Sequence, residues 1–142
     1  MLKSSARNQF VGVVSEILIG AVNAEVHVKL KGGETIVAAI TKESVTSLAI
    51  EIGMEIVALV KTSHIILVTD FGGYRFSARN QLQGDVVEIK QDEAEIKIEL
   101  TSGEQVISSV SPTSFETLKL CKGQRVTALF KAGAVILAVP HS

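Results

Sequence analysis

Residues 95–100 are Glu95-Ile96-Lys97-Ile98-Glu99-Leu100, a run in which polar and apolar side chains alternate without a break. Successive side chains of a β-strand point to opposite faces of the sheet, so this run predicts a strand with one buried face. A glycine-containing turn and a second β-rich run over residues 105–110 follow, and together they predict a hairpin. The same pattern stands earlier in the chain, over residues 25–30 and 35–40.

The hairpin occurs twice because the whole chain is a tandem duplication. The run Ser5-Ala6-Arg7-Asn8-Gln9 returns unchanged as Ser77-Ala78-Arg79-Asn80-Gln81. Matches continue in the same order as far as Ile66-Leu67, which pairs with Ile136-Leu137. Two copies of a unit this long are too few for a solenoid. We therefore predict two domains of similar fold.

The boundary between the predicted domains falls in the segment 69–74. Its paired glycines, Gly72 and Gly73, suit a tight turn. A short connection keeps the two units adjacent and limits their relative orientation. The predicted domains are residues 1–71 and 72–142.

Each copy also shows signs of further strands and one short helix. The helix is expected to begin at Thr41, where Thr and Ser provide capping groups, and to end near Gly53, with Gly123 as the matching glycine. Five strands with a helix between the third and fourth indicate an OB-like barrel. The predicted fold class is therefore all-β, mainly β with one short helix per repeat, as two tandem OB-like five-stranded barrels. The other expected strands are 10–18, 56–61, 65–68, 126–131 and 135–139.

The composition excludes several classes of protein. Of the 142 residues 46% are apolar and 20% are charged, and the formal net charge is −1. These values exclude a disordered chain and argue against a surface for nucleic-acid phosphates. Every apolar run is far shorter than the about 20 residues of a membrane-spanning helix, and no signal-peptide pattern opens the sequence. We expect a cytoplasmic protein with no membrane partner, in which subunit contacts bury part of the apolar surface.

Catalytic motifs are not recognisable in the sequence. It contains no phosphate loop, no GxGxxG and no GxSxG. The histidines His27, His64 and His141 are not repeated as histidines, and Cys121 stands where the first copy has Glu51. We predict that the protein is not an enzyme, that it has no catalytic residues, and that it holds no metal cation.

Hydrogen-bond donors dominate the polar residues that both copies retain. Each copy keeps Ser-Ala-Arg-Asn at its start, a hydroxyl pair around the short helix, and a lysine at the end of its fourth strand. Such donors suit an anion, whereas a metal cation would need carboxylates, and the one carboxylate in this set, Glu43, is replaced by Thr113 in the second copy. The hydroxyl pairs are Thr41 with Ser44 and Ser111 with Ser114, and the lysines are Lys61 and Lys131.

A structural interpretation of the same residues stays open. Asn8 is expected to cap backbone groups locally in that case, while Thr41 and Ser44 are helix caps and Lys61 is a solvated strand end. Folding, however, does not require an arginine and a lysine to be kept in both copies. Their joint retention favours a binding function.

Four motifs of the first copy form one combination. They are the opening Ser-Ala-Arg-Asn-Gln, the loop Gly20-Ala21-Val22-Asn23-Ala24-Glu25-Val26, Thr-x-x-Ser at the helix and the closing Val60-Lys61-Thr62-Ser63. It resembles the molbindins, the Mop or TOBE-type molybdate-binding domains, and two in tandem resemble the di-Mop proteins. The resemblance covers essentially the whole chain. It implies OB-like barrels, a homotrimer, and molybdate or tungstate held at domain and subunit interfaces for molybdenum storage and homeostasis, with no organic cofactor.

The resemblance also implies which residues hold the oxyanion. One domain would supply three residues of its opening motif, and a neighbouring domain would supply hydroxyls and a lysine. In the first copy these are Ser5, Ala6 and Arg7, with Thr41, Ser44, Lys61 and Thr62. In the second they are Ser77, Ala78 and Arg79, with Ser111, Ser114, Lys131 and Ala132, where Ala132 offers only a backbone donor.

A second type of oxyanion site is implied near a threefold axis. It would use the loop residues Ala21, Val22, Asn23 and Ala24 of the first copy. The second copy has the shorter, acidic run 91–94 there, and carboxylates gathered around an axis would repel a dianion. We expect this site in the first copy alone.

Two other functions are considered. An OB-type module can bind single-stranded nucleic acid, but it needs a basic groove and stacking aromatic residues. Here the aromatic content is 4%, tryptophan is absent and the charges balance, so we expect no nucleic-acid partner. The other alternative is an assembly protein that binds no ligand.

Overall fold

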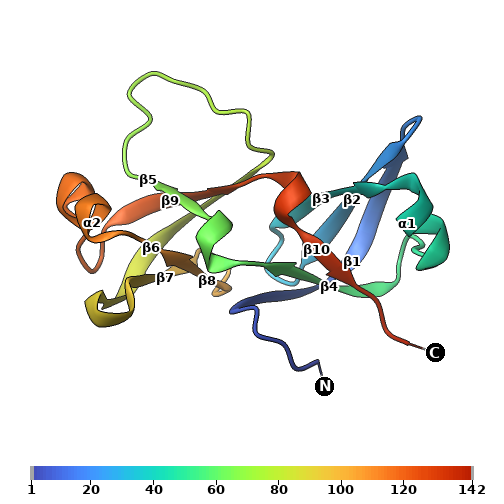
Figure 1. The fold of residues 1–142 in the computed structure, drawn as a ribbon, viewed down its shortest axis with the longest axis horizontal. Coiled ribbons are helices and arrows are strands. Elements are labelled where there is room, and N and C mark those ends of the chain that lie inside the picture. The colour runs from blue at the N-terminus through green and yellow to red at the C-terminus, as the bar shows by residue number, and fades with distance from the viewer. Residues whose placement is uncertain (1, 142) are drawn as a thin grey trace.

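The computed structural model describes residues 2–141, and its backbone forms two five-stranded antiparallel sheets (Figure 1). This architecture confirms the predicted mainly β fold with one α-helix in each repeat. The first repeat contributes β1 (Asn8–Ile19), β2 (Asn23–Leu30), β3 (Thr35–Thr41), β4 (Glu55–Val60) and β5 (Ile66–Val68). The second contributes β6 (Asn80–Lys90), β7 (Glu95–Leu100), β8 (Gln105–Ser109), β9 (Arg125–Phe130) and β10 (Ile136–Ala138).

The fifth strands are exchanged between the repeats, which the sequence did not predict. The sheet orders are β10-β4-β1-β2-β3 and β5-β9-β6-β7-β8, so each sheet takes its last strand from the other repeat. The expectation that each copy would close its own barrel was therefore wrong. Period-two alternation identifies a strand but not its partner, and the two fourth strands present nearly the same edge, Ala58-Leu59 and Ala128-Leu129.

The short α-helices are α1 (Lys42–Ser47) and α2 (Pro112–Leu118). The Thr41 hydroxyl caps α1 and the Ser111 hydroxyl caps α2, each accepting a hydrogen bond from the backbone N–H three residues on. Three-residue 3-10 turns also occur, and the sequence did not predict them. They are η1 (Thr62–His64), η2 (Gln91–Glu93) and η3 (Ala132–Ala134).

The helices do not end at the predicted glycines. In the first repeat α1 stops at Ser47, and Ala49 adopts the left-handed conformation at φ 52°. Lys119 does the same after α2, at φ 50°. Gly53 instead lies in the turn before β4, where its N–H donates to the Val14 carbonyl at 2.8 Å. Gly53 therefore belongs to the contact between this turn and β1, and it does not end the helix.

The long first strand of each repeat bends across its sheet. A bulge interrupts the β1–β2 register between Val14 and Glu16, and the same irregularity recurs in β6. Gly12 lies where β1 crosses β2 so closely that a Cβ there would stand 2.6 Å from the Lys29 carbonyl oxygen. Gly84 has the same distance to the Glu99 carbonyl oxygen. The matched glycines therefore reflect close strand packing.

A continuous apolar core runs through both repeats. Its largest fully buried side chains include Phe10 and Phe130, and the exchanged strands add Leu67 and Leu137 to it. The two repeats therefore share buried apolar area instead of meeting only at their surfaces. Burial of this kind is the dominant stabilising contribution in a small protein.

The connection between the repeats runs from β5 to β6 and arches away from the sheets (Figure 1). Its predicted turn is present: Gly72 and Gly73 have φ values of 58° and 85°, and the Tyr74 N–H donates to the Phe71 carbonyl at 2.9 Å. Phe71 and Phe76 pack edge to face inside the loop. The exact division at residues 71 and 72 stays a prediction.

Candidate functional site

A cavity of about 350 Å³ lies where the opening segment of the chain passes the end of β4. It is lined by the predicted residues Ser5, Ala6, Arg7, Lys61 and Thr62. The structure thus brings together, from one repeat, two groups that the sequence placed on different domains. Ser4, Ser63 and Ile136 of the exchanged strand β10 complete the wall, together with Leu59 and Val60. We call this cavity and the residues behind it the first junction.

Lys61 is placed at the cavity by the turn that follows β4. It is the exposed residue before η1, in extended conformation at φ −68° and ψ 142°. Thr62 begins the turn and Ser63 follows it, so one short segment presents an ammonium group and two hydroxyls to the same space. All three side chains are hydrogen-bond donors.

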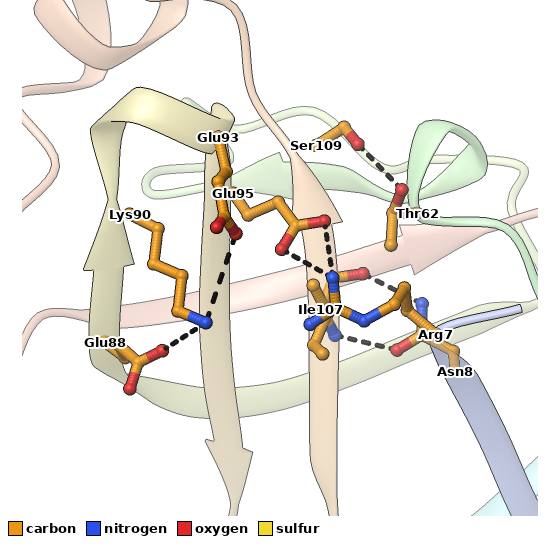
Figure 2. Close-up of polar contacts among 9 residues, drawn as sticks. All are labelled: Arg7, Asn8, Thr62, Glu88, Lys90, Glu93, Glu95, Ile107 and Ser109. Carbon is orange, nitrogen blue, oxygen red and sulfur yellow. Dashed lines mark hydrogen bonds and ion pairs between the residues drawn. The ribbon is translucent and has the colours of Figure 1, made fainter. Parts of the chain in front are cut away.

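Arg7 reaches out of its own repeat to a carboxylate of the other. Its Nη1 donates to both oxygens of Glu95 on β7, at 3.0 Å from each (Figure 2). The Glu95 side chain is 15% exposed, so the pair lies at the edge of the interface between repeats. Arg7 therefore has two roles: it lines the cavity, and its ion pair holds the opening segment against the second repeat.

Asn8, next to Arg7, continues this attachment as a side chain paired with backbone. Its Nδ2 donates to the Ile107 carbonyl at 2.8 Å, and its Oδ1 accepts from the Ile107 N–H at 2.7 Å (Figure 2). Asn80 makes the same two bonds to Val37 of β3, at 2.9 and 2.8 Å. The expected local capping by Asn8 was thus wrong, because the amide satisfies an edge strand of the other repeat.

The Thr62 hydroxyl is also tied to the second repeat. Its Oγ1 lies 2.7 Å from Ser109 Oγ at the end of β8, a normal distance for a hydroxyl pair (Figure 2). Ser109 stands opposite Glu95 in the β7–β8 register, so the partners of Thr62 and Arg7 are neighbours across two strands. One small area of the second repeat supports both.

A second cavity, of about 610 Å³, occupies the equivalent place in the other half, the second junction. Ser77, Ala78 and Lys131 line it as predicted, with Ile66 of the exchanged strand β5. Ser63 and His64 of the first repeat also line it, whereas Arg79 and Ala132 of the predicted set are not among its lining residues. Phe76 stands where the first copy has Ser4, and Gly133 where it has Ser63.

Arg79 forms an ion pair across the repeats, like Arg7. Its Nη1 contacts Glu25 of β2, and Glu25 is also 3.4 Å from the Nε2 of His27. Partial desolvation raises the pKa of Glu25, but hydrogen bonds and charge from His27 and Arg79 outweigh that effect and lower the pKa below its ordinary value. In the other half Lys97 stands where His27 does.

The predicted hydroxyl pairs lie apart from these linings. The Thr41 and Ser44 hydroxyl oxygens are 2.8 Å apart at the start of α1, and those of Ser111 and Ser114 are 3.0 Å apart at the start of α2. Each pair caps its own helix, as the structural interpretation expected. Within the chain they do not meet the lysines, and their part in the oxyanion site stays a prediction.

The loop predicted to form the second type of site is an exposed turn. Gly20 N–H donates to the Asn23 carbonyl at 2.8 Å, the side chain of Val22 is exposed, and Ala24 is buried at the start of β2. Ala21 is exposed beside Val22. The second repeat replaces this turn by η2, with Asp92 and Glu93 exposed. The role of this loop stays a prediction.

Other sites are limited by what the described residues contain. Among residues 2–141 no cluster of three or more histidine, cysteine, aspartate or glutamate side chains is placed to hold a metal ion. Over the same residues, no helix is long and apolar enough to cross a membrane.

Comparison with known proteins identifies the fold family. The TOBE domain model matches the chain twice, over residues 4–67 and 77–137. The chain belongs to the TOBE family, as a tandem Mop protein of the molbindin type. The two matches follow the duplication that the sequence shows.

Two curated relatives are longer chains that match this chain over nearly its whole length. The molybdenum transport protein ModE of Herbaspirillum seropedicae is 41% identical over 140 residues, which are 97% of this chain and 52% of the relative. The molybdenum-pterin-binding protein MopA of Rhodobacter capsulatus is 37% identical over 142 residues, 98% of this chain and 53% of the relative. The chain therefore spans about half the length of these relatives.

A solved structure matches over its full length. The crystal structure of the cytoplasmic molybdate-binding protein ModG, in a form with molybdate bound, superposes with a TM-score of 0.91. The two chains are 42% identical, and the match covers 98% of this chain and 100% of ModG. The TOBE repeats described here thus share both sequence and arrangement with a ligand-bound protein.

The sequence missed the residues that support the cavities from behind. Glu25 and Glu95 do stand at matched positions in the two copies, which is a signal that they share a role. Ser109 gives no such signal, because its counterpart is Ala39. Both kinds of residue matter through contacts between repeats, and these depend on the strand exchange.

Proposed function

We propose that this protein binds molybdate or tungstate, as a storage and buffering protein of molybdenum homeostasis. The observation that carries the proposal is the first junction, where Ser5, Arg7, Lys61 and Thr62 surround one cavity. The likeness to molybdate-bound ModG supports it, because the match extends over both repeats. The cytoplasmic location of ModG also supports a cytoplasmic location here.

The donors at the cavity fit the chemistry of a tetrahedral oxyanion. Molybdate at neutral pH has two negative charges and four acceptor oxygens, and it carries no proton to donate. Hydroxyl and ammonium groups satisfy such oxygens, and their effect strengthens as water is excluded. A cavity somewhat larger than sulfate needs would select molybdate and tungstate over sulfate. Selection by size would hardly distinguish molybdate from tungstate. Binding would require no chemical step, and the protein is not an enzyme.

We place the anions between domains and subunits of a homotrimer. Ile66 and Ile136, exposed by 62% and 61%, line the two cavities, and the outer face of β1 exposes Val11 and Val13. A neighbouring copy that covers these residues would close the cavities and bring Thr41 and Ser44 to the lysines. Because the ligand would bind only the assembled form, it would also stabilise the trimer.

The second type of site, at Ala21 to Ala24, belongs to the same proposal. It would form where copies of the exposed turn meet around the trimer axis. In the second repeat, Asp92 and Glu93 would place carboxylates around that axis and repel a dianion.

Single-stranded nucleic acid is not favoured as the ligand. MopA and ModG are named for binding molybdenum-pterin and molybdate, whereas ModE of Escherichia coli (strain K12) is a DNA-binding regulator of which this chain matches only 52%. The chain itself has few aromatic residues and a net charge of −1. A gel shift with single-stranded oligonucleotides at low salt should show no complex.

Calorimetric titration with molybdate and with sulfate tests the proposed function. We expect saturable binding of molybdate and much weaker binding of sulfate. Absence of molybdate binding, or equal affinity for the two anions, would reject the proposal.

A further inference from the structure

The hydroxyl pair of Thr62 and Ser109 distinguishes the first junction from the second. Thr62 belongs to the turn after β4 of the first repeat, and Ser109 to the edge strand of the second, yet their oxygens are 2.7 Å apart. The contact follows from the strand exchange, which carries η1 across β8. Thr62 and Arg7 both line the cavity and hydrogen-bond to the second repeat through their side chains.

The second junction has no hydroxyl at either of the equivalent positions. Ala132 begins η3 as Thr62 begins η1, and η3 contacts β3 as η1 contacts β8. Ala39 of β3 stands opposite Glu25 in the same register in which Ser109 stands opposite Glu95. Thus both members of the pair are hydroxyls in one half, and both are alanines in the other.

The hydrogens of the two hydroxyl groups determine which of them can donate to a ligand. One hydroxyl donates to the other, and the accepting group keeps its own hydrogen for a third partner. Thr62 lines the cavity, whereas Ser109 on β8 is not among the lining residues and bonds to Thr62 from the other repeat (Figure 2). If Ser109 donates to Thr62, the remaining hydrogen belongs to Thr62 and is available to an anion in the cavity. A hydroxyl that accepts in this way is also a better donor, because hydrogen bonds in a chain polarise one another.

We propose that Ser109 is a positioning residue for oxyanion binding, which fixes the Thr62 hydroxyl as a donor, and that the first junction consequently binds the anion more tightly than the second. The inference rests on the proposed function, since it concerns the strength of the same two sites. Two other replacements agree with it: Phe76 and Gly133 carry no hydroxyl where the first copy has Ser4 and Ser63, although Ser63 itself reaches both cavities. The two unequal junctions give one chain a tight site and a weaker site for the same anion.

The first test removes the Ser109 hydroxyl from the full chain. Molybdate titration of the wild type should resolve a tighter and a weaker class of sites, and Ser109→Ala should weaken the tighter class by about tenfold, the scale of one hydrogen bond to a charged partner. Ser109→Thr keeps the hydroxyl on the same strand and should restore the wild-type affinity. Ser102→Ala, in the β7–β8 turn, is the matched loss of a hydroxyl and should change nothing.

The second test moves the hydroxyl pair to the other half. Ala39→Ser with Ala132→Thr recreates both hydroxyls at the second junction, and the weaker class should tighten by a severalfold factor while the tighter class is unchanged. Either substitution alone should have a smaller effect, because the pair works as a unit. A circular dichroism melt of each variant shows that it is folded.

The outcomes separate this inference from the proposed function. If the wild type binds molybdate but Ser109→Ala binds with the same affinity, or Ser109→Thr is as weak as Ser109→Ala, the role of Ser109 is rejected and the proposed function stands. Identical affinities for all wild-type sites reject the inequality of the junctions. If the wild type binds no molybdate at all, the proposed function fails and this inference fails with it.

Discussion

The two junctions are built by the same rules and differ in their detail. In both, an arginine of the opening motif pairs with a glutamate of the other repeat, and an asparagine bonds to an edge strand there. The first cavity is lined by hydroxyl residues at positions 4, 62 and 63, whose counterparts in the second copy are Phe76, Ala132 and Gly133. Ser63 also reaches the second cavity, and Ala132 does not line it. The duplication has therefore preserved the contacts that join the repeats more strictly than the donors that would face a ligand.

This difference separates two roles within one short motif. Asn8 and Asn80 hold the repeats together, and neither they nor their bonded partners line the two junction cavities. Lys61 and Lys131 line the cavities, and within residues 2–141 neither side chain makes a hydrogen bond or ion pair that would explain why both are kept. Folding thus accounts for the asparagines, while the proposed anion binding would account for the lysines.

The largest expected effect comes from removing both lysines. Lys61→Ala with Lys131→Ala should weaken molybdate binding by roughly a hundredfold, because each site loses a charge-assisted donor. In single variants, Lys61→Ala should remove the tighter class of sites and Lys131→Ala the weaker one. Calorimetric titration measures both effects. The control, Lys29→Ala with Lys31→Ala, changes net charge by the same amount at the end of β2 and in the turn after it. Equal losses in the two double variants would indicate nonspecific attraction.

The next effect concerns stability, and it differs between the junctions. Asn80→Ala leaves the N–H and carbonyl of the buried residue Val37 without partners and should cost about 2–4 kcal/mol. Asn8→Ala should cost less, since Ile107 is only part-buried and water can replace the amide. Urea unfolding of the two variants gives the comparison. Equal costs, both near zero, would show that these bonds do not hold the repeats together.

The smallest expected effect is a difference in acid sensitivity. The pKa of Glu25 is lowered in the folded protein, so its ion pair stabilises the fold above the ordinary carboxyl pKa of about 4.3 and loses that contribution as the pH falls further. The thermal midpoint should therefore drop at acid pH slightly less in Glu25→Gln than in the wild type. Lys29→Gln, on the same strand, serves as a control for charge loss. If the thermal midpoint of Glu25→Gln depends on pH as that of the wild type does, Glu25 does not contribute to the loss of stability in acid.

The sequence predicted the strands well because each has a local signature. The alternation over 95–100 gave the bounds of β7, and Thr41 and Ser111 marked the helix caps. It did not predict that β5 and β10 exchange, because the residues 66–68 and 136–138 are nearly interchangeable and their choice of sheet depends on the path of the chain between them.

The candidate site was predicted in part for the same reason. Arg7 and Lys61 could be found because duplication left a matched copy of each. Glu95 and Ser109 act across the interface, and the sequence spacing between them and Arg7 or Thr62 carries no information about contact. Only the register of β7 and β8 beside the opening segment brings them together.

Elemental analysis tests the central claim most directly. The purified protein is mixed with equimolar molybdate and sulfate, separated from free anions by gel filtration, and measured for molybdenum and sulfur beyond its own cysteine and methionine. The proposed function predicts that molybdenum elutes with the wild-type protein and not with Lys61→Ala, Lys131→Ala. Elution of the wild type without molybdenum, or with as much bound sulfate as molybdate, would contradict it.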